Sequence, residues 1–232
     1  MAIKQIAFFG DSYCYDSKQN PLSRCSETGE ETYIDFLSLP TVHFGTPGHG
    51  PNWTIHQLQE WFKENDPRET FFIFCWSDVC RDILSAPECT DDWREHSGEL
   101  SAPGPDAPMV NELEDQRWAQ ALKLWWVHLR NEKQYYRYWE TIKLAFKHLL
   151  WANNITHYKE FFCFLDLMEY EENKLDFIQD GKVFGCLYDY AHHFPDYGEE
   201  GVHDLNYKNH FSPTGHKEMA RYINKMIEQQ CE

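Results

Sequence analysis

Ser12 and His210 stand near the two ends of the 232-residue chain and supply the side-chain types that nucleophilic catalysis needs. Ser12 follows Gly10 and Asp11. The three residues end an apolar run over residues 6–9, where a buried strand would turn toward a helix. A serine hydroxyl becomes an effective nucleophile when a histidine takes its proton, so the pair predicts acyl transfer. The alternative is an ordinary turn in which Asp11 or Ser12 only caps a helix.

Two further turns could supply the hydrogen-bond donors that stabilise the oxyanion of an acyl-transfer intermediate. A glycine-rich turn over residues 45–50 follows a predicted strand, and glycine lets a backbone N–H approach a ligand closely. The backbone N–H of Gly48 is a candidate donor there. Ser77 follows the most apolar strand of the chain and can donate from its side chain. Glycine and proline also punctuate ordinary loops, which is the competing interpretation of the 45–50 turn.

These residues can meet only if the chain builds a sheet of parallel strands, whose carboxyl ends lie along one edge where ligands bind. Continuous apolar runs are typical of such strands when both faces are covered. The predicted strands cover residues 3–9, 41–44, 69–76 and 161–166, and the predicted helices cover 31–39, 53–62 and a C-terminal segment that Ser212 caps and Pro213 begins. Asp166, at the end of the fourth strand, is open to a structural or a functional role.

A long helical segment is predicted over residues 110–153. Its aromatic and aliphatic residues recur at helical spacing, which favours a face packed on the sheet over a groove for a sugar or acyl chain. Residues 168–209 are predicted to be an acidic loop. Its histidines have no metal-ligand spacing, so no metal site is predicted there.

The composition predicts a single α/β domain over residues 1–232. Hydrophobic residues make up 42% of the chain, and a chain of this length can bury one sizeable core. The formal net charge of -17 disfavours nucleic acid and anionic membrane surfaces as partners. No apolar run in the sequence is long enough to span a bilayer.

The first residues lack the basic, apolar and small-residue regions of a signal peptide, so the predicted location is the cytoplasm. In that compartment the eight cysteines are predicted to be free thiols rather than disulfides. Cys75, Cys80 and Cys89 form no Cys-x-x-Cys pair, which disfavours a zinc site.

Taken together, these motifs resemble those of the GDSL or SGNH hydrolases, a family named for Ser, Gly, Asn and His in four sequence blocks. Residues 10–12, Gly-Asp-Ser after an apolar strand, are similar to the first block. The 45–50 turn is similar to the second block, which implies Gly48 as the oxyanion donor, with Gly45 as the alternative. Residues 76–78, Trp-Ser-Asp, stand in the place of the third block. His210, followed by Ser-Pro-Thr-Gly-His at 212–216, has the shape of the last block.

Two positions depart from the family pattern. The third block usually has Asn before Asp, where this chain has Ser77, whose hydroxyl donates one hydrogen bond but reaches less far than an amide. Aspartate usually stands three residues before the histidine, where this chain has Tyr207. Asp204 could orient His210 if the loop bulges. Otherwise a backbone carbonyl would orient the imidazole, leaving a Ser-His dyad.

The resemblance implies a flavodoxin-like three-layer α/β/α sandwich with a central parallel sheet, the SGNH hydrolase fold, in which the 110–153 segment is a helical insertion. It implies an esterase that acts on a small-molecule or carbohydrate acyl ester, such as an O-acetyl group, without a cofactor or metal. Ser12 would attack, His210 would act as base and then acid, and Gly48 and Ser77 would hold the oxyanion, with Asp11 in support. An acyltransferase with the same site is one alternative. A non-catalytic carbohydrate-binding or structural protein that kept the fold is another.

Overall fold

The computed structural model describes the central sheet, the helices that flank it and the C-terminal helix. The described residues are 3–14, 31–45, 50–77, 120, 124, 132–163, 177–179, 182–194, 196 and 211–231. They include the carboxyl ends of the first three predicted strands, where most of the candidate site residues were expected.

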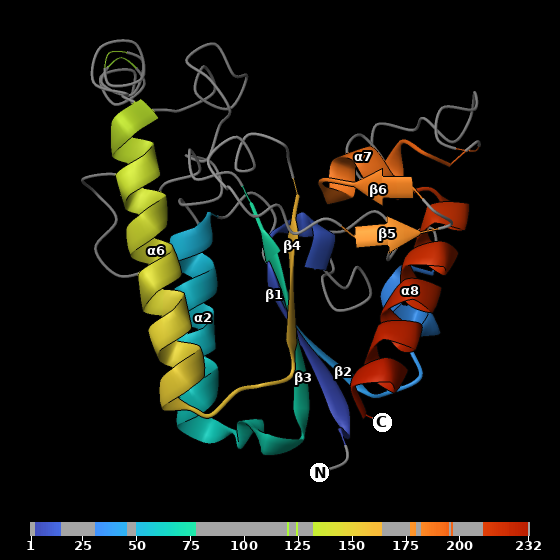
Figure 1. Ribbon diagram of the computed structural model, residues 1–232, viewed down its shortest axis with the longest axis horizontal. Helices are drawn as coiled ribbons and strands as arrows, with labels where there is room; N and C mark the ends of the chain where they lie inside the picture. Colours follow the sequence, from blue (N-terminus) through green and yellow to red (C-terminus); the bar gives the residue numbers. More distant parts are fainter. Residues whose placement is uncertain are drawn as a thin grey trace.

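Four parallel strands form the central sheet, in the order β2-β1-β3-β4 (Figure 1). They are β1 (Gln5–Gly10), β2 (Thr41–Gly45), β3 (Thr70–Trp76) and β4 (Tyr158–Phe162). The first three predicted strands are confirmed, and so is the α/β class. The predicted bounds of the fourth strand, 161–166, are wrong. β4 lies earlier because its first three side chains are only half-buried, and their polar groups hide the strand from an apolar-run criterion.

The order of the strands reverses beside β1. β1 pairs with β2 on one side and with β3 on the other, so the chain must cross over β1 to reach β3. In open parallel sheets, ligands bind beyond the carboxyl ends of the strands at such a reversal. Gly10, Gly45 and Cys75 lie level with one another at these ends. The chain therefore enters the Gly10-Asp11-Ser12 turn at the place where this kind of sheet usually binds a ligand.

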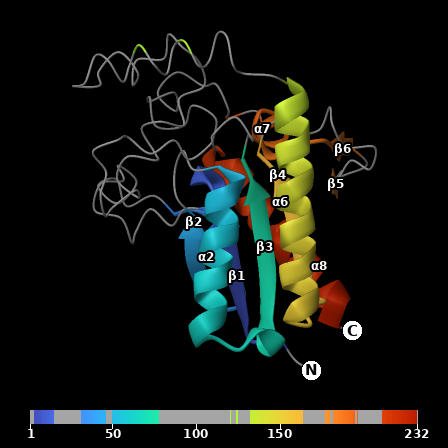
Figure 2. The same cartoon turned by 90° about the vertical axis from the view of Figure 1, so that its left-hand side faces the viewer.

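Two long helices cover one face of the sheet (Figures 1 and 2). α2 (Pro51–Glu64) begins directly after Gly50, and α6 (Glu132–Ala152) lies beside it. The apolar stripe of α6 packs on the sheet, as predicted, with Trp139, Ile142, Phe146 and Leu150 all buried. Of the earlier part of the predicted helical segment, residues 120 and 124 are described, and both are helical.

The opposite face is covered by α8 (Pro213–Cys231), the short helix α7 (Leu187–Ala191) and the 3-10 turn η2 (Tyr33–Phe36) (Figure 1). Alternate strand residues serve the two faces. Phe8 and Ile73 belong to this core, whereas Phe9 and Phe74 belong to the core under α2 and α6. The helix predicted over 31–39 is shorter than expected because the backbone is already extended at Leu37.

The loop predicted over 168–209 contains regular structure, so that prediction is wrong in part. β5 (Phe177–Gln179) and β6 (Lys182–Phe184) pair in antiparallel fashion, and α7 follows them. The segment is rich in acidic residues, but Phe184, Leu187 and Tyr190 are buried and anchor it to the core. His192 and His193 are exposed, in agreement with their prediction as solvated side chains.

Candidate active site

A glycine is required at the end of β1 because the neighbouring strand leaves no room for a side chain. Gly10 has a φ of 151°, a value that residues with a side chain rarely adopt. A Cβ atom on Gly10 would lie 2.2 Å from the carbonyl oxygen of Cys75. This close approach lets the backbone turn sharply out of the sheet into the 3-10 turn η1 (Ser12–Cys14). Ser12 is thereby the first residue of the turn that follows β1.

Gly45, at the end of β2, lets the η1 turn lie directly on the neighbouring strand. A Cβ atom there would lie 2.6 Å from the carbonyl carbon of Cys14 and 2.7 Å from its oxygen. The sequence identifies Gly45 as the alternative oxyanion donor. The structure brings its backbone against η1, so both glycines that border the site are constrained by packing.

Asp11 holds the η1 turn together from inside the protein. Its side chain is fully buried, and its Oδ1 accepts hydrogen bonds from the Tyr13 N–H (3.0 Å) and from the Cys163 thiol (3.1 Å). Its carbonyl oxygen accepts from the Cys14 N–H at 3.0 Å. Asp11 therefore acts as the cap of the turn, a role that the sequence raised as an alternative to chemistry. A cap of this kind fixes the backbone on both sides of Ser12.

Ser77 lies directly after β3, beside β1, and is only 1% exposed. Its Oγ has no hydrogen-bond partner among the residues that the structure describes. Leaving a buried hydroxyl without a partner costs about 1–3 kcal/mol of stability, so a buried hydroxyl of this kind calls for an explanation, such as a catalytic role. The donor role of Ser77 stays a prediction, and the lack of a hydrogen-bond partner for its Oγ among the described residues is compatible with it.

Three buried thiols lie at the turn: Cys14 is its last residue, and Cys75 and Cys163 belong to the neighbouring part of the sheet. Burial raises the pKa of the Cys14 thiol well above its usual range, and a hydrogen bond with Cys75 raises it further. Cys14 is therefore a protonated, unreactive thiol at neutral pH, and its Sγ donates to the Phe9 carbonyl oxygen at 3.4 Å. Together with Cys186, these three are the cysteines whose side chains the structure describes, and all four are free thiols, as predicted.

Aromatic packing joins η1 to the segment that enters α8. The rings of Tyr13 and Phe211 meet edge to face with centroids 5.5 Å apart, and Phe211 also contacts Tyr33 and Tyr190. The Tyr33 hydroxyl donates to the Tyr13 carbonyl oxygen at 2.5 Å, and burial raises the pKa of that phenol well above its usual range. The chain neighbours of Ser12 and His210 are thus in direct contact within the core.

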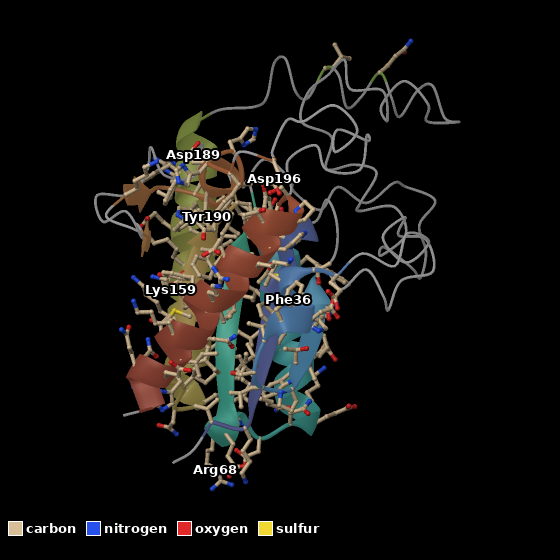
Figure 3. All side chains as sticks on the ribbon, turned by 90° about the vertical axis from the view of Figure 1, so that its right-hand side faces the viewer. Phe36, Arg68, Lys159, Asp189, Tyr190 and Asp196 are labelled. Carbon is tan, nitrogen blue, oxygen red and sulfur yellow. The ribbon has the colours of Figure 1, made fainter. Side chains whose placement is uncertain are left out.

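The start of α8 is tied down by Asp196, a residue that the sequence did not single out. The Ser212 hydroxyl donates to Asp196 Oδ1 (2.7 Å), and the Thr214 N–H donates to Oδ2 (3.0 Å). The Gly215 N–H donates to Ser212 Oγ at 3.1 Å, which confirms Ser212 as the predicted cap. Partial burial raises the pKa of Asp196, but these hydrogen bonds lower it more, so the pKa lies below its ordinary value. Figure 3 shows Asp196 beside the first turn of α8.

Several predicted site residues lie outside the described part of the chain. They are Gly48, Asp204 and His210, together with the side chain of Ser12, whose backbone is described. Among the site residues that are described, the structure brings Asp11 and Ser77 to adjacent strand ends and places Gly45 against η1. Cys163 is an addition to the predicted set. Because the sequence analysis predicts the fourth strand at 161–166, it names Asp166 as the residue at the strand end. Asp166 lies outside the described residues.

A hollow of about 620 Å³ lies at the opposite end of the sheet, around the amino ends of the strands. Its charges neutralise one another, because Lys4 Nζ lies 2.7 Å from Glu69 Oε1 and Arg68 Nε donates to Asp66 at 2.9 Å. Figure 3 places Arg68 at the far end of the molecule from Asp196. The charged side chains of the hollow are engaged with one another in exposed ion pairs, so the turn after β1 is the better candidate for chemistry.

Comparison with known proteins leaves the site to be interpreted from its own residues. Among the described residues, no three His, Cys, Asp or Glu side chains gather in a metal-binding group. Across the same part of the chain, no helix is long and apolar enough to cross a membrane. The sequence matches no protein-family model and no curated protein.

Proposed function

We propose that this chain is a serine hydrolase of the SGNH type, which cleaves a small acyl ester with Ser12 as its nucleophile. One observation carries the proposal: Ser12 begins a turn at the strand reversal, and the buried Asp11 holds that turn. At the adjacent strand end lies the buried hydroxyl of Ser77, which has no hydrogen-bond partner among the described residues. A serine at a strand-end turn, next to an unused donor, is the arrangement that nucleophilic acyl transfer needs.

The sheet supports a flavodoxin-like architecture for the proposed fold. Its order, β2-β1-β3-β4, begins in the same way as the 2-1-3-4-5 order of flavodoxin-like proteins, with helices on both faces. In that arrangement, the ends of β1 and β3 border the ligand site. Ser77 follows β3 directly, and Ser12 stands two residues after the end of β1.

In the proposed reaction, the Ser12 hydroxyl attacks the ester carbonyl while His210 takes its proton. The negative charge that develops on the carbonyl oxygen is held by the Ser12 N–H, by Ser77 Oγ and by a glycine N–H of the 45–50 turn. His210 then protonates the leaving alcohol, and water cleaves the acyl-enzyme by the reverse proton transfers. The contact between Tyr13 and Phe211 supports this pairing, because these residues are the chain neighbours of the nucleophile and the base.

Asp204 is proposed as the group that orients His210, and a backbone carbonyl is the other possibility. The comparison of Asp204→Ala with His210→Ala separates them. A triad aspartate is usually worth about 10⁴ in kcat, so a loss below about tenfold for Asp204→Ala removes it from the triad.

The proposal is tested with a fluorophosphonate probe and with p-nitrophenyl acetate. We expect the wild type to be labelled and to turn over the ester, and Ser12→Ala to lose both properties. Ser38→Ala is the matched control, because it removes an exposed serine hydroxyl just before the amino end of β2, at the other end of the strands from Ser12, and should change neither property. If the wild type is neither labelled nor active, the chain is not a serine hydrolase, and a carbohydrate-binding protein becomes the better proposal.

The p-nitrophenyl acetate assay, run with and without a sugar alcohol, distinguishes hydrolysis from acyl transfer. Both reactions form the acyl-enzyme, and they differ in whether water or an alcohol accepts the acyl group. A wild type that is labelled and turns over only when a sugar alcohol is present is an acyltransferase. Turnover in water alone, with acetate as product, supports the proposed esterase.

A further inference from the structure

We infer that Cys163 is a positioning residue for the Ser12 turn: its thiol orients the Asp11 carboxylate, which in turn fixes the backbone that carries the nucleophile. The effect on rate rests on the proposed function. The contact between the thiol and the carboxylate does not, and it can be measured separately.

Cys163 contacts the turn from a position two strands away in the sheet. It follows β4, which is separated from β1 by β3, and its Sγ lies 3.1 Å from Asp11 Oδ1. Both side chains are fully buried. The Cys163 N–H donates to the Trp76 carbonyl oxygen at 2.8 Å, which holds the thiol in place beyond the last residue of the strand.

The contact matters because Asp11 Oδ1 accepts hydrogen bonds from at least two donors in the described part of the chain. One is the Cys163 thiol, and another is the Tyr13 N–H, which belongs to η1 itself. A buried carboxylate is stable only while its oxygens are hydrogen-bonded. Without the thiol, the carboxylate gains freedom to rotate, and the Tyr13 N–H that it holds gains the same freedom. The turn that begins at Ser12 would then be less well ordered.

The other thiols of the cluster have different roles. Cys14 donates to the Phe9 carbonyl oxygen, inside the turn's own segment. Cys75 is hydrogen-bonded with Cys14, and its carbonyl oxygen is the atom that excludes a side chain at Gly10. Cys163 connects the turn to a strand that lies 152 residues away in sequence.

The test uses three variants of the full chain. Cys163→Ala removes the donor, and Cys163→Ser keeps a donor of similar size. Cys186→Ala is the matched control, because Cys186 is equally buried but its Sγ accepts from the Asp189 N–H instead. The measurements are kcat and KM with p-nitrophenyl acetate, and the melting temperature.

We expect Cys163→Ala to lower kcat by about tenfold or more, since small displacements at a catalytic group have effects of this size or larger. KM and the melting temperature should change no more than in Cys186→Ala. Cys163→Ser should restore kcat to within about threefold of the wild type, because a hydroxyl is a stronger donor than a thiol. Equal kcat values for Cys163→Ala and Cys186→Ala would overturn the inference and leave the proposed esterase intact.

An infrared measurement makes the two proposals separable. The difference between the wild-type and Cys163→Ser spectra isolates the S–H stretching band of Cys163. A hydrogen bond to a carboxylate should place this band below that of Cys186, obtained from Cys186→Ala in the same way. A lowered band in a protein without esterase activity would support the contact and contradict the proposed function. A band level with that of Cys186 would overturn the contact itself.

Discussion

Phe211 packs edge to face against Tyr13, with the ring centroids 5.5 Å apart. Tyr13 follows Ser12 in the chain, and Phe211 follows His210, so this contact joins the two segments on which the proposed catalysis depends. Both rings are buried, at 2% and 1% exposure. The backbone next to the proposed nucleophile and the backbone next to the proposed base are therefore held by one aromatic cluster.

Removing the Phe211 ring should reduce both stability and activity. We expect Phe211→Ala to lower the free energy of unfolding by about 3–5 kcal/mol, because it leaves a cavity among buried rings. At a temperature where the variant is still folded, kcat should fall by about tenfold or more, since the segment next to His210 loses its anchor.

Phe184→Ala is the control for this prediction. Phe184 is a buried ring of the same core that packs on Tyr190 rather than on Tyr13. It should lose a comparable amount of stability in urea unfolding and keep its kcat. A Phe211→Ala variant with full kcat would show that the aromatic contact has no part in catalysis.

A side chain at Gly10 should be far more damaging than one at Gly215. Gly10→Ala would place a Cβ 2.2 Å from a backbone oxygen and require a φ that alanine rarely adopts, so we expect a loss above about 3 kcal/mol. At Gly215 the nearest atom is a Phe194 ring carbon at 3.0 Å, and alanine gains about 1 kcal/mol in helix propensity. Urea unfolding measures both. Equal stabilities would contradict the tight contact between β1 and β3.

The parts of the fold that the sequence predicts well are those with a local signature. β1, β2 and β3 are recognisable as apolar runs, and α8 as a serine cap followed by proline. β4 is displaced by several residues in the prediction, because an edge strand of the described sheet needs little apolar surface in its first half. The contents of 168–209 are missed because three-residue strands fall below any periodic signal.

The candidate site divides in a similar way. The position of Asp11 and Ser77 at the carboxyl edge of the sheet is predictable, because each residue follows an apolar strand and parallel strands end at one edge. The contact of Cys163 with Asp11 is not, because it depends on the order of the strands and on side-chain rotamers across the sheet. Gly48, Asp204 and His210 stay predictions from sequence.

The stability of the folded chain should depend on the ionisation of Asp196. Its pKa in the folded protein lies below the ordinary value of 3.8, because the hydrogen bonds from Ser212 and Thr214 outweigh the effect of burial. A carboxyl with a lowered pKa contributes stability above its unfolded pKa and loses that contribution as the pH falls through the lowered value. The window for this loss therefore lies below about pH 4.

Asp196→Asn tests this dependence. We expect it to lower the free energy of unfolding by about 0.5–1 kcal/mol near neutral pH, a modest value because the carboxylate is partly in solvent. The difference from the wild type should shrink as the pH falls below about 4. Asp189→Asn removes an acidic group from nearby α7 and serves as the control (Figure 3). A difference that is constant with pH would contradict the role given to the Asp196 charge.

Ser77 should show opposite effects on activity and stability when its hydroxyl is removed. If Ser77 Oγ holds the oxyanion, Ser77→Ala should lower kcat by about 10²-fold with little change in KM, the usual cost of losing one such donor. Because the buried hydroxyl has no partner in the described part of the chain, its removal should leave the free energy of unfolding unchanged or higher. Ser212→Ala provides the contrast: that hydroxyl is hydrogen-bonded at the start of α8, and its loss should cost about 1 kcal/mol. A second variant, Ser77→Asn, should retain more activity than Ser77→Ala, because its amide can donate to the same oxyanion.

Reduced stability with full kcat in Ser77→Ala would instead identify the hydroxyl as a structural group.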